Sequence, residues 1–347
     1  MKKTLAALIV TAFAASAANA AVVYDNEGTK VELNGSLRLI MEKADKKEYT
    51  AAGQSTKKAN SALRNAGSRF GITVKHNLDN DFYALGRLEF RFDDTTSRDK
   101  FGRLYAKRAY VGLGSKATGD ITFGRQLTIS DDLSQAVDYE YGFIPKSEYI
   151  PTAGTGVVRY DYKGIEGLQL SANYNFGQTN DEKGNPLKPG IKNAYAVGAL
   201  YTVGDLDARL AYGHTNFETD ASYAHRLDGV LASLGYKFGD FTLTGDFGYG
   251  HEKLDDAKVN KFYVSPGFAY QVVPASKVYG NYLYERAKGE SDKVKTHGFL
   301  LGADYKLHKQ VVLFVEGKYV TAKKYTNDAY DGKVKDRAIG VGMRVFF

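Results

Sequence analysis

The chain has 347 residues, the length of two or three average soluble domains, and it contains no cysteine. The lack of cysteine excludes disulfide frameworks, thiol nucleophiles and cysteine-based metal or iron–sulfur sites. The formal charge of +7 comes from 47 basic and 40 acidic residues, a mixed balance that gives little support to nucleic-acid binding.

The first twenty residues have the pattern of a secretory signal peptide. Lys2 and Lys3 form a positive start, a run rich in Leu, Ala, Ile and Val follows, and Ala-Asn-Ala supplies a small-x-small cleavage site. We therefore expect residues 1–20 to be cleaved and residues 21–347 to form one exported domain. Removing the two lysines leaves 45 basic residues against 40 acidic ones, a net charge of +5.

Apolar and polar residues alternate along the remaining chain. In residues 29–43 the odd positions are apolar or small, whereas the even positions are mostly polar. The same alternation recurs in residues 168–176, 241–249 and 339–347. Period-two patterns of this kind are typical of β-strands with one face in water. After residue 21 no stretch approaches the roughly 20 apolar residues that a membrane-spanning helix requires.

Turn signals between these segments fall into two length classes. Seven links are short, such as residues 77–80 and 238–240. Eight polar links are long, and they lie near residues 44–65, 93–103, 127–154, 178–192, 214–226, 251–259, 287–296 and 322–333. Together these links join sixteen strands at about 20 residues per strand and link, which suits an up-and-down barrel with short turns at one end.

A sixteen-stranded closed sheet encloses more volume than side chains can fill. Its polar face therefore lines water and its apolar face meets lipid, whereas in a soluble sandwich the apolar faces of two sheets would stack. We predict an all-β fold, a 16-stranded antiparallel transmembrane β-barrel that crosses the outer membrane of a Gram-negative bacterium many times. Aromatic residues near the expected strand ends fit interfacial girdles.

Side-chain parity places a set of basic residues on the water-lined face. These residues are Arg38, Arg69, Lys75, Arg87, Arg91, Arg108, Arg159, Arg209 and Arg344. Arg87, Glu89 and Arg91 form a dense charged strip on one strand. Opposed acidic and basic walls would create a transverse field across a narrow aqueous passage. The alternative for each arginine is an ordinary salt bridge that stabilises the wall.

No motif points to catalysis or to a bound cofactor. The six histidines lack a pair at metal-ligand spacing, and the glycines of residues 112–114 lie in an expected strand without the helix that a dinucleotide site needs. The chain also lacks a Gly-x-Ser-x-Gly elbow and a phosphate-binding loop. We predict that the protein is not an enzyme and uses no metal and no cofactor.

Four segments resemble the Gram-negative general diffusion porins. Residues 68–72 read Ser-Arg-Phe-Gly-Ile, residues 107–113 read Lys-Arg-Ala-Tyr-Val-Gly-Leu, residues 119–125 read Gly-Asp-Ile-Thr-Phe-Gly-Arg, and the chain ends in Phe347. The resemblance covers essentially the whole mature length, and it is strongest to the major outer-membrane porins of Haemophilus and its relatives.

This resemblance implies a homotrimer of barrels, each with its third long loop, residues 127–154, folded into the lumen. It also implies a constriction in which loop carboxylates face wall arginines. The acidic loop residues are Asp131, Asp132, Asp138 and Glu140, and the basic wall residues are Arg38, Arg69, Arg87, Arg91, Arg108 and Arg159. By motif, Arg69 and Arg108 match the family's wall arginines, and Asp138 and Glu140 match its loop acids. Phe347 resembles the family's signal for the outer-membrane assembly machinery.

We predict an outer-membrane channel for passive diffusion of small hydrophilic solutes and ions, with outer-membrane lipid, lipopolysaccharide and the assembly machinery as partners. One alternative is a substrate-specific channel for phosphorylated or other anionic nutrients, which the strip of Arg87 and Arg91 favours. A second alternative is a barrel adhesin that acts through exposed loops such as residues 44–65 and 322–333.

Overall fold

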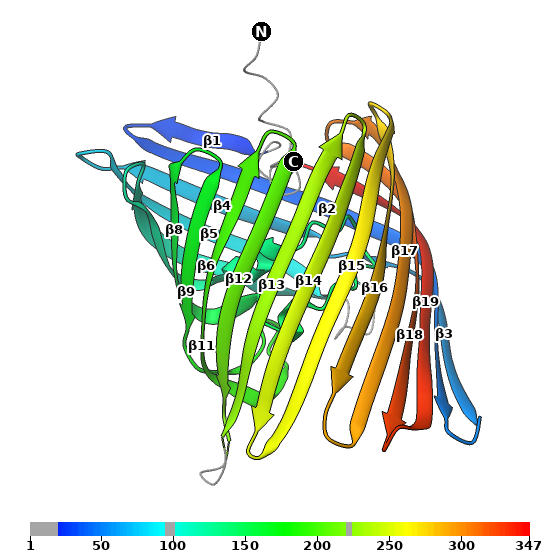
Figure 1. Ribbon diagram of the computed structural model, residues 1–347. Coiled ribbons are helices and arrows are strands. Elements are labelled where there is room, and N and C mark those ends of the chain that lie inside the picture. Colours follow the sequence, from blue (N-terminus) through cyan, green and yellow to red (C-terminus); the bar gives the residue numbers. More distant parts are fainter. Residues whose placement is uncertain (1–19, 94–100, 220–223) are drawn as a thin grey trace.

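The computed structural model describes residues 20–93, 101–219 and 224–347 (Figure 1). The predicted signal peptide therefore lies outside the described residues except for Ala20. Strands dominate the described chain. In chain order they are β1 (Ala21–Asn26), β2 (Thr29–Thr50), β3 (Ser55–Asn65), β4 (Arg69–Asn77), β5 (Phe82–Asp93), β6 (Arg103–Ser115), β7 (Gly119–Leu127), β8 (Ala153–Ile165), β9 (Leu168–Asn175), β10 (Gln178–Asn180), β11 (Pro186–Val203), β12 (Leu206–Phe217), β13 (His225–Phe238), β14 (Phe241–Leu254), β15 (Ala257–Val273), β16 (Ser276–Lys288), β17 (Asp292–His308), β18 (Val311–Thr326) and β19 (Ala329–Phe346).

These strands form one closed antiparallel barrel. β3 and β4 pair with successive parts of β2, and β9 and β10 pair with successive parts of β11, so each couple is one interrupted wall strand. The wall closes where residues 332–346 of β19 pair with residues 36–50 of β2. β1 pairs with the start of β2. With β1 as a short addition, the wall has the sixteen strands that the sequence predicts (Figure 1).

The outer face of the wall is apolar. On β2 the side chains of Leu37, Leu39 and Met41 are exposed, whereas Ser36 and Ile40, at the alternate positions, are buried. Exposed apolar and aromatic side chains continue in the same register around the other strands. The alternation seen in the sequence therefore corresponds to one lipid-facing and one inward-facing side of each strand.

The short turns agree with the sequence prediction, but several predicted long loops do not. Two-residue connections join β11 to β12, β13 to β14, β15 to β16 and β17 to β18. At the other end, β2 continues to Thr50 and β3 starts at Ser55, so most of residues 44–65 is paired strand. The segments 251–259, 287–296 and 322–333 are also largely paired. These hairpins extend beyond the apolar band, so they lack the alternation by which strands were recognised.

The long segment between β7 and β8 lies against the inner face of the wall. It contains two short 3₁₀ helices, η1 (Ile129–Leu133) and η2 (Lys146–Glu148), and no helix of the described residues is long and apolar enough to cross a membrane. Its apolar side chains join two buried clusters with inward-facing residues of the strands. One cluster contains Ile129, Leu133, Tyr149 and Ile150 of the segment together with Leu231, Tyr263 and Leu283 of the wall.

Glycines allow this segment to approach the wall closely. Gly213, Gly229 and Gly250 are register partners on β12, β13 and β14. A Cβ atom at Gly229 would lie 2.2 Å from the carbonyl oxygen of Tyr149, and one at Gly213 would lie 2.5 Å from Ile150. The row of glycines, which we call the glycine seat, therefore lets the end of the segment pack directly on the wall. The whole segment between β7 and β8, residues 128–152, is the third loop.

Candidate functional site

Four arginines surround one carboxylate on the inner face of β4, β5 and β6. Glu89 is 3% exposed, and its carboxylate lies 2.7 Å from Arg91 Nε and 2.9 Å from Arg87 Nη2. Nη1 of Arg108 lies 3.7 Å away and Nη1 of Arg69 lies 4.0 Å away. The strand register brings these groups together, because Glu89 and the four arginines all point to the inward-facing side of the wall. Within the part of the chain that the structure describes, one carboxylate thus faces four guanidinium groups.

Two further arginines extend this group across the closure of the barrel. Arg38 on β2 and Arg344 on β19 are register partners, and Ser36, which accepts a 2.7 Å hydrogen bond from Arg38 Nε, is the register partner of Arg69. Among the described residues, Glu89 is the one carboxylate within 4.0 Å of any of these six arginines. We call the six arginines the arginine cluster.

The arginine cluster has hydrogen-bond donors to spare. The Nε atoms of Arg87, Arg108 and Arg344 are buried without an acceptor among the described residues. A guanidinium group presents five N–H donors in a fixed planar arrangement, which matches the oxygens of carboxylates and phosphates. The cluster can therefore attract an anion and also bond to it.

The acidic third loop faces its own set of partners. Asp132 lies 3.0 Å from Arg159 Nη2, and its carbonyl oxygen accepts a 2.7 Å hydrogen bond from Arg209. Burial raises the pKa of Asp132, although the charge of Arg159 opposes the shift. The carbonyl oxygen of Asp131 accepts a hydrogen bond from Lys146, while its carboxylate acts electrostatically on Arg108. Arg159 thus pairs with the loop residue Asp132 and with Asp161 of its own strand.

Glu140 pairs with an arginine that the sequence interpretation missed. Nη1 of Arg64, on β3, lies 2.6 Å from Glu140, and the same guanidinium donates two 2.8 Å hydrogen bonds to Glu42. The Tyr141 hydroxyl donates a 3.0 Å bond to Glu42. Arg64 follows the exposed Leu63 and so has inward parity, a signal that was available in the sequence but was hidden inside a predicted loop.

Glu316 on β18 fixes the middle of the third loop. This carboxylate is 0% exposed, and it accepts hydrogen bonds from the backbone N–H groups of Tyr139 (2.7 Å), Glu140 (2.8 Å) and Tyr141 (2.5 Å) and from the Tyr279 hydroxyl (2.9 Å). Hydrogen bonds to a charged group each contribute about 1.5–3 kcal/mol. Sequence parity places Glu316 on the inner face, since Val315 is exposed, but it does not reveal that its partners come from the loop.

Other wall carboxylates fix the loop on either side of this point. Asp246 accepts hydrogen bonds from the Ser134 hydroxyl (2.5 Å) and from the backbone N–H of Gln135 (3.0 Å). Asp304 accepts a 2.6 Å bond from the Tyr139 hydroxyl. Because these acceptors lie on β14 and β17 and the loop begins at β7, the loop crosses the interior of the barrel.

Asp138 lies in the middle of the third loop, and its side chain is exposed to solvent. Desolvation by the surrounding protein atoms raises its pKa to about 6, the negative charge of Glu316 adds to the shift, and Arg344 and Lys146 oppose it. Arg344 also donates a hydrogen bond to the carbonyl oxygen of Tyr139, and its guanidinium lies 4.7 Å from the centre of that ring. Arg344 therefore connects the arginine cluster to the loop.

The charges of the interior are unevenly distributed. The arginine cluster lies on β19, β2, β4, β5 and β6, and the carboxylates that bind the third loop lie on β14, β17 and β18. Within residues 20–93, 101–219 and 224–347, no group of three or more His, Asp or Glu side chains is arranged to hold a metal ion. A closed antiparallel barrel with an apolar outer face and a charged, loop-narrowed interior defines an outer-membrane channel.

Comparison with known proteins gives the family. The family model of Gram-negative porins matches residues 4–325, and this chain belongs to that family. The major outer membrane protein of Pasteurella multocida strain Pm70 is similar to it, with 31% identity over 370 residues that cover all of both chains. The predicted family, the non-enzymatic channel function and the outer-membrane location are confirmed.

Solved structures share the fold. OmpT of Vibrio cholerae in its membrane-expressed form matches with a TM-score of 0.71 and 18% identity over 94% of this chain and 100% of that one. An anion-selective porin from Comamonas acidovorans matches with a TM-score of 0.66 and 18% identity over 92% of this chain and 100% of that one. At these identities the likeness concerns the barrel and not its solutes.

Proposed function

We propose that small hydrophilic solutes and ions diffuse passively through a constriction between the arginine cluster and the third loop. The observation that carries this proposal is the uneven distribution of charge: four arginines surround Glu89, the one carboxylate within 4.0 Å of them among the described residues, and the third loop brings further carboxylates into the interior. A transverse field of this kind orders water and dipolar solutes and disfavours apolar molecules, which cannot replace the ordered water.

The test is ion selectivity, measured as the reversal potential across a planar bilayer with a salt gradient. Arg69→Gln combined with Arg108→Gln should shift the permeability ratio towards cations, because two positive charges leave the passage. Asp138→Asn combined with Glu140→Gln should shift it towards anions. A matched control removes two exposed basic side chains from the loop end of β13 and β15, Arg226→Gln with Lys258→Gln, and should change neither ratio. If both site variants behave like the control, the constriction lies elsewhere.

A second candidate is a channel with a preference for phosphorylated or other anionic nutrients. The spare Nε donors of Arg87, Arg108 and Arg344 favour it, because they would bond to phosphate oxygens without displacing an existing partner. Such a channel would show saturable block of its current by a phosphate ester, and block would weaken in Arg87→Gln. Current that falls only in proportion to solute size would instead indicate general diffusion.

We also propose that the mature protein, which begins at Ala21, forms a homotrimer. The Vibrio cholerae OmpT structure is described in a trimer form, and it shares this fold at a TM-score of 0.69. Unheated electrophoresis with chemical crosslinking would show a species of three times the barrel mass, and insertions into a bilayer would open in steps of three. Single steps with no crosslinked trimer would contradict the proposal.

A further inference from the structure

One hairpin at the loop end of the barrel reaches back across the rim. It comprises β10, the turn at residues 181–185 and the start of β11, and we call residues 178–191 the bent hairpin. Its base is bound to β8, because Gln178 Oε1 accepts hydrogen bonds from the backbone N–H (2.8 Å) and the hydroxyl group (3.1 Å) of Thr155. Its tip contacts β6, where Glu182 forms an ion pair with Lys107. Since β7 lies between β6 and β8 in the wall, the tip crosses the ends of these strands.

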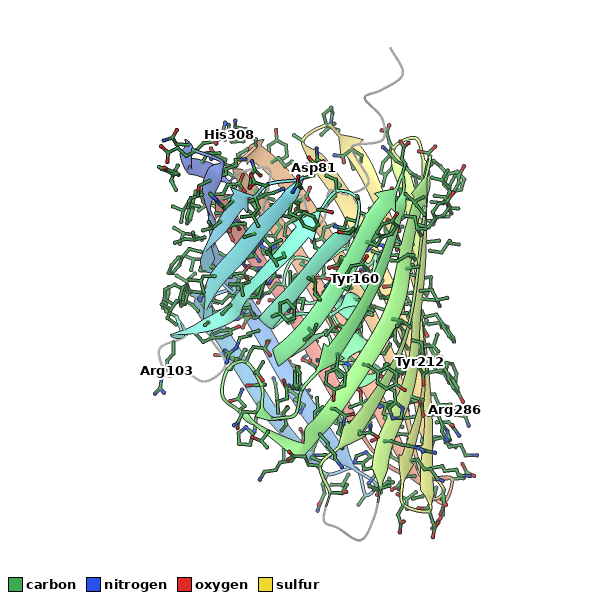
Figure 2. The ribbon with its side chains drawn as sticks, turned by 90° about the vertical axis from the view of Figure 1, so that its left-hand side faces the viewer. Asp81, Arg103, Tyr160, Tyr212, Arg286 and His308 are labelled. Carbon is green, nitrogen blue, oxygen red and sulfur yellow. The ribbon has the colours of Figure 1, made fainter. Side chains whose placement is uncertain are left out.

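The wall is low on this side of the barrel. β7 has 9 residues and β6 and β8 have 13 each, whereas β15 and β17 have 17 each. Figure 2 shows Arg103, the first residue of β6, nearer to the short-turn end at Asp81 and His308 than the hairpins of the longer strands are. In outer-membrane barrels the longer connections are extracellular. The bent hairpin therefore lies over a low part of the outer rim.

The turn of the bent hairpin is stiff. The carboxylate of Asp181 accepts hydrogen bonds from the backbone N–H groups of Lys183 (2.9 Å) and Asn185 (2.8 Å) and from the side-chain amide of Asn185 (2.9 Å). Gly184 has a φ of +88°, in the left-handed region that favours glycine. Glu182 is thus carried on a turn that keeps its own shape, so the turn can move as one piece.

Lys107, the partner of Glu182, lies at the edge of the arginine cluster. It directly precedes Arg108, and it is the extra residue of a β-bulge in β6. The charges of Arg91 in the arginine cluster and of Asp131 in the third loop both act on the Lys107 ammonium group, and Asp131 acts on Arg108 as well. The ion pair with Glu182 therefore lies beside the passage between the cluster and the third loop.

Further contacts hold the tip on the inward side of β6. Lys183 lies 6.0 Å from the centre of the Tyr105 ring, and Tyr105 is the register partner of the inward-facing Arg91. Arg125 donates a 3.2 Å hydrogen bond to the carbonyl oxygen of Glu182. The side chains of Lys107 and Glu182 are 14% and 24% exposed, so each charge depends on the other for much of its stabilisation.

We propose that Glu182 is a specificity-determining residue of the channel, because it holds the bent hairpin over the entrance and neutralises Lys107 there. With the ion pair formed, one cation beside the arginine cluster is masked and the entrance is narrowed. When the pair separates, the stiff turn moves away from β6 on its base at β8, and a free ammonium group is added to the cluster. The inference rests on the proposed function, since it concerns the entrance to the same constriction.

The first test removes the charge of Glu182. Reversal potentials would be measured with the mature protein in planar bilayers at about 0.1 M salt, where charges act over about 10 Å. Glu182→Gln should shift the permeability ratio towards anions, because Lys107 loses its counter-charge. The matched control, Glu290→Gln, removes the same charge from the exposed turn between β16 and β17 and should leave the ratio unchanged. Equal ratios in the two variants would overturn the proposal.

The second test distinguishes a contact that holds the hairpin from a simple sum of charges. Single-channel conductance would be measured at about 1 M salt, where the field is screened beyond about 3 Å. Lys107→Glu and Glu182→Lys each place like charges at the contact, so both should raise the conductance although they change the net charge in opposite directions. The double variant restores an ion pair in reversed order and should return to the conductance of the unchanged protein.

Non-additivity of this kind is the mark of direct coupling between two side chains. Effects of the two reversals that merely add would overturn the proposal. Glu182→Lys alters the tip of a hairpin and not the wall, so an unchanged conductance in that variant would overturn it even where Lys107→Glu does not fold.

Failure of this inference can be told apart from failure of the proposed function. If Arg69→Gln with Arg108→Gln shifts selectivity while the Glu182 variants match Glu290→Gln, the bent hairpin does not control the entrance and the constriction stands. If the reversed pair restores the conductance but the arginine variant changes no ratio, the inference stands and the narrowest point of the passage lies elsewhere.

Discussion

Asp138 differs from the other loop carboxylates in how strongly its surroundings disfavour its charge. The side chain is exposed to solvent, but desolvation by the surrounding protein atoms and the nearby negative charge of Glu316 raise its pKa to about 6, against the opposing charges of Arg344 and Lys146. The carboxylate is therefore ionised at neutral pH and protonated under mildly acidic conditions. One side chain on the loop can change the field across the constriction within the pH range of ordinary habitats.

We expect the permeability ratio of the channel to shift towards anions between pH 7 and pH 5, because Asp138 loses its negative charge through about pH 6. In Asp138→Asn this step should disappear. Reversal potentials at a series of pH values would measure it. The raised pKa also means that the neutral acid favours the folded loop, a contribution present in full below about pH 4 and lost as the pH rises through about 6. Identical pH profiles for the variant and the unchanged protein would contradict the assignment.

The sequence predicts the residues of the site better than their partners. Parity alone places Arg38, Arg69 and Arg108 on the inner face, because one-residue alternation decides the face of a strand. It does not show that Arg64 pairs with Glu140, since that contact joins residues 76 positions apart through the course of the loop. Ion pairs across a lumen depend on how the wall closes, which no local pattern contains.

At the scale of the element, the third loop is held by the wall more than by its own structure. Its two helices span five and three residues, too few to be stable alone. Its position follows from the carboxylates of β14, β17 and β18 and from the glycine seat on β12, β13 and β14. The anchors are spread over β12, β13, β14, β17 and β18, so the loop keeps its position only while these strands remain in place.

Glu316→Gln should loosen the middle of the loop. The amide keeps one accepting oxygen, whereas the carboxylate accepts four hydrogen bonds, two at each oxygen. We expect a loss of about 1–3 kcal/mol in stability and a larger, noisier single-channel conductance. Glu252→Gln is the control, since Glu252 is bonded to His225 and Lys261 and not to the loop. Steady currents of unchanged size would show that the carboxylate does not hold the loop.

Gly229→Ala should disturb the same loop at its other end. The added Cβ would lie 2.2 Å from the Tyr149 carbonyl oxygen, so the loop backbone must move. We expect a lower unfolding midpoint together with a changed conductance. Gly245→Ala, on the adjacent strand, adds the same methyl group where no heavy atom lies within 4 Å, and should leave both quantities unchanged. If Gly229→Ala left the unfolding midpoint and the conductance unchanged, the close packing of the loop against β13 would be contradicted.

The hairpins at the loop end show why element boundaries were harder to predict than elements. Residues 44–65 and 322–333 carry polar side chains on both faces, because these parts of the strands stand in water beyond the lipid. Apolar alternation is absent there, yet backbone pairing continues up to the turns. The alternation of apolar and polar residues depends on whether a strand faces lipid or water. Here the strands pass from lipid into water before their backbone pairing ends.

At the scale of the whole molecule, β1 and the C-terminal residue Phe347 both contact β2. The backbone of Phe347 exchanges hydrogen bonds of 2.8 and 3.1 Å with Gly35, next to the stretch of β2 that β1 covers. We expect Phe347→Ala to reduce the amount of folded barrel in the outer membrane of living cells and to leave refolding from urea in detergent nearly unchanged. Heat-modifiable mobility in membrane fractions would measure it, with Phe346→Ala as the control. If Phe347→Ala reduced refolding in detergent as much as it reduced folded barrel in cells, the Phe347 ring would act only through its packing in the folded protein.

The pairing of β19 with β2 also sets the order of events during folding. The contact of Asp45 with Arg337 joins residues 292 positions apart, so the last strand to leave the ribosome is also needed to complete the first. Until then, both β2 and β18 would present unpaired edges, which invite association with other chains. Long-range pairing of this kind is slow, because the chain loses conformational entropy on bringing distant strands together before their contacts can form and compensate for the loss. The barrel can therefore close only after β19 has been made, so closure comes late in folding.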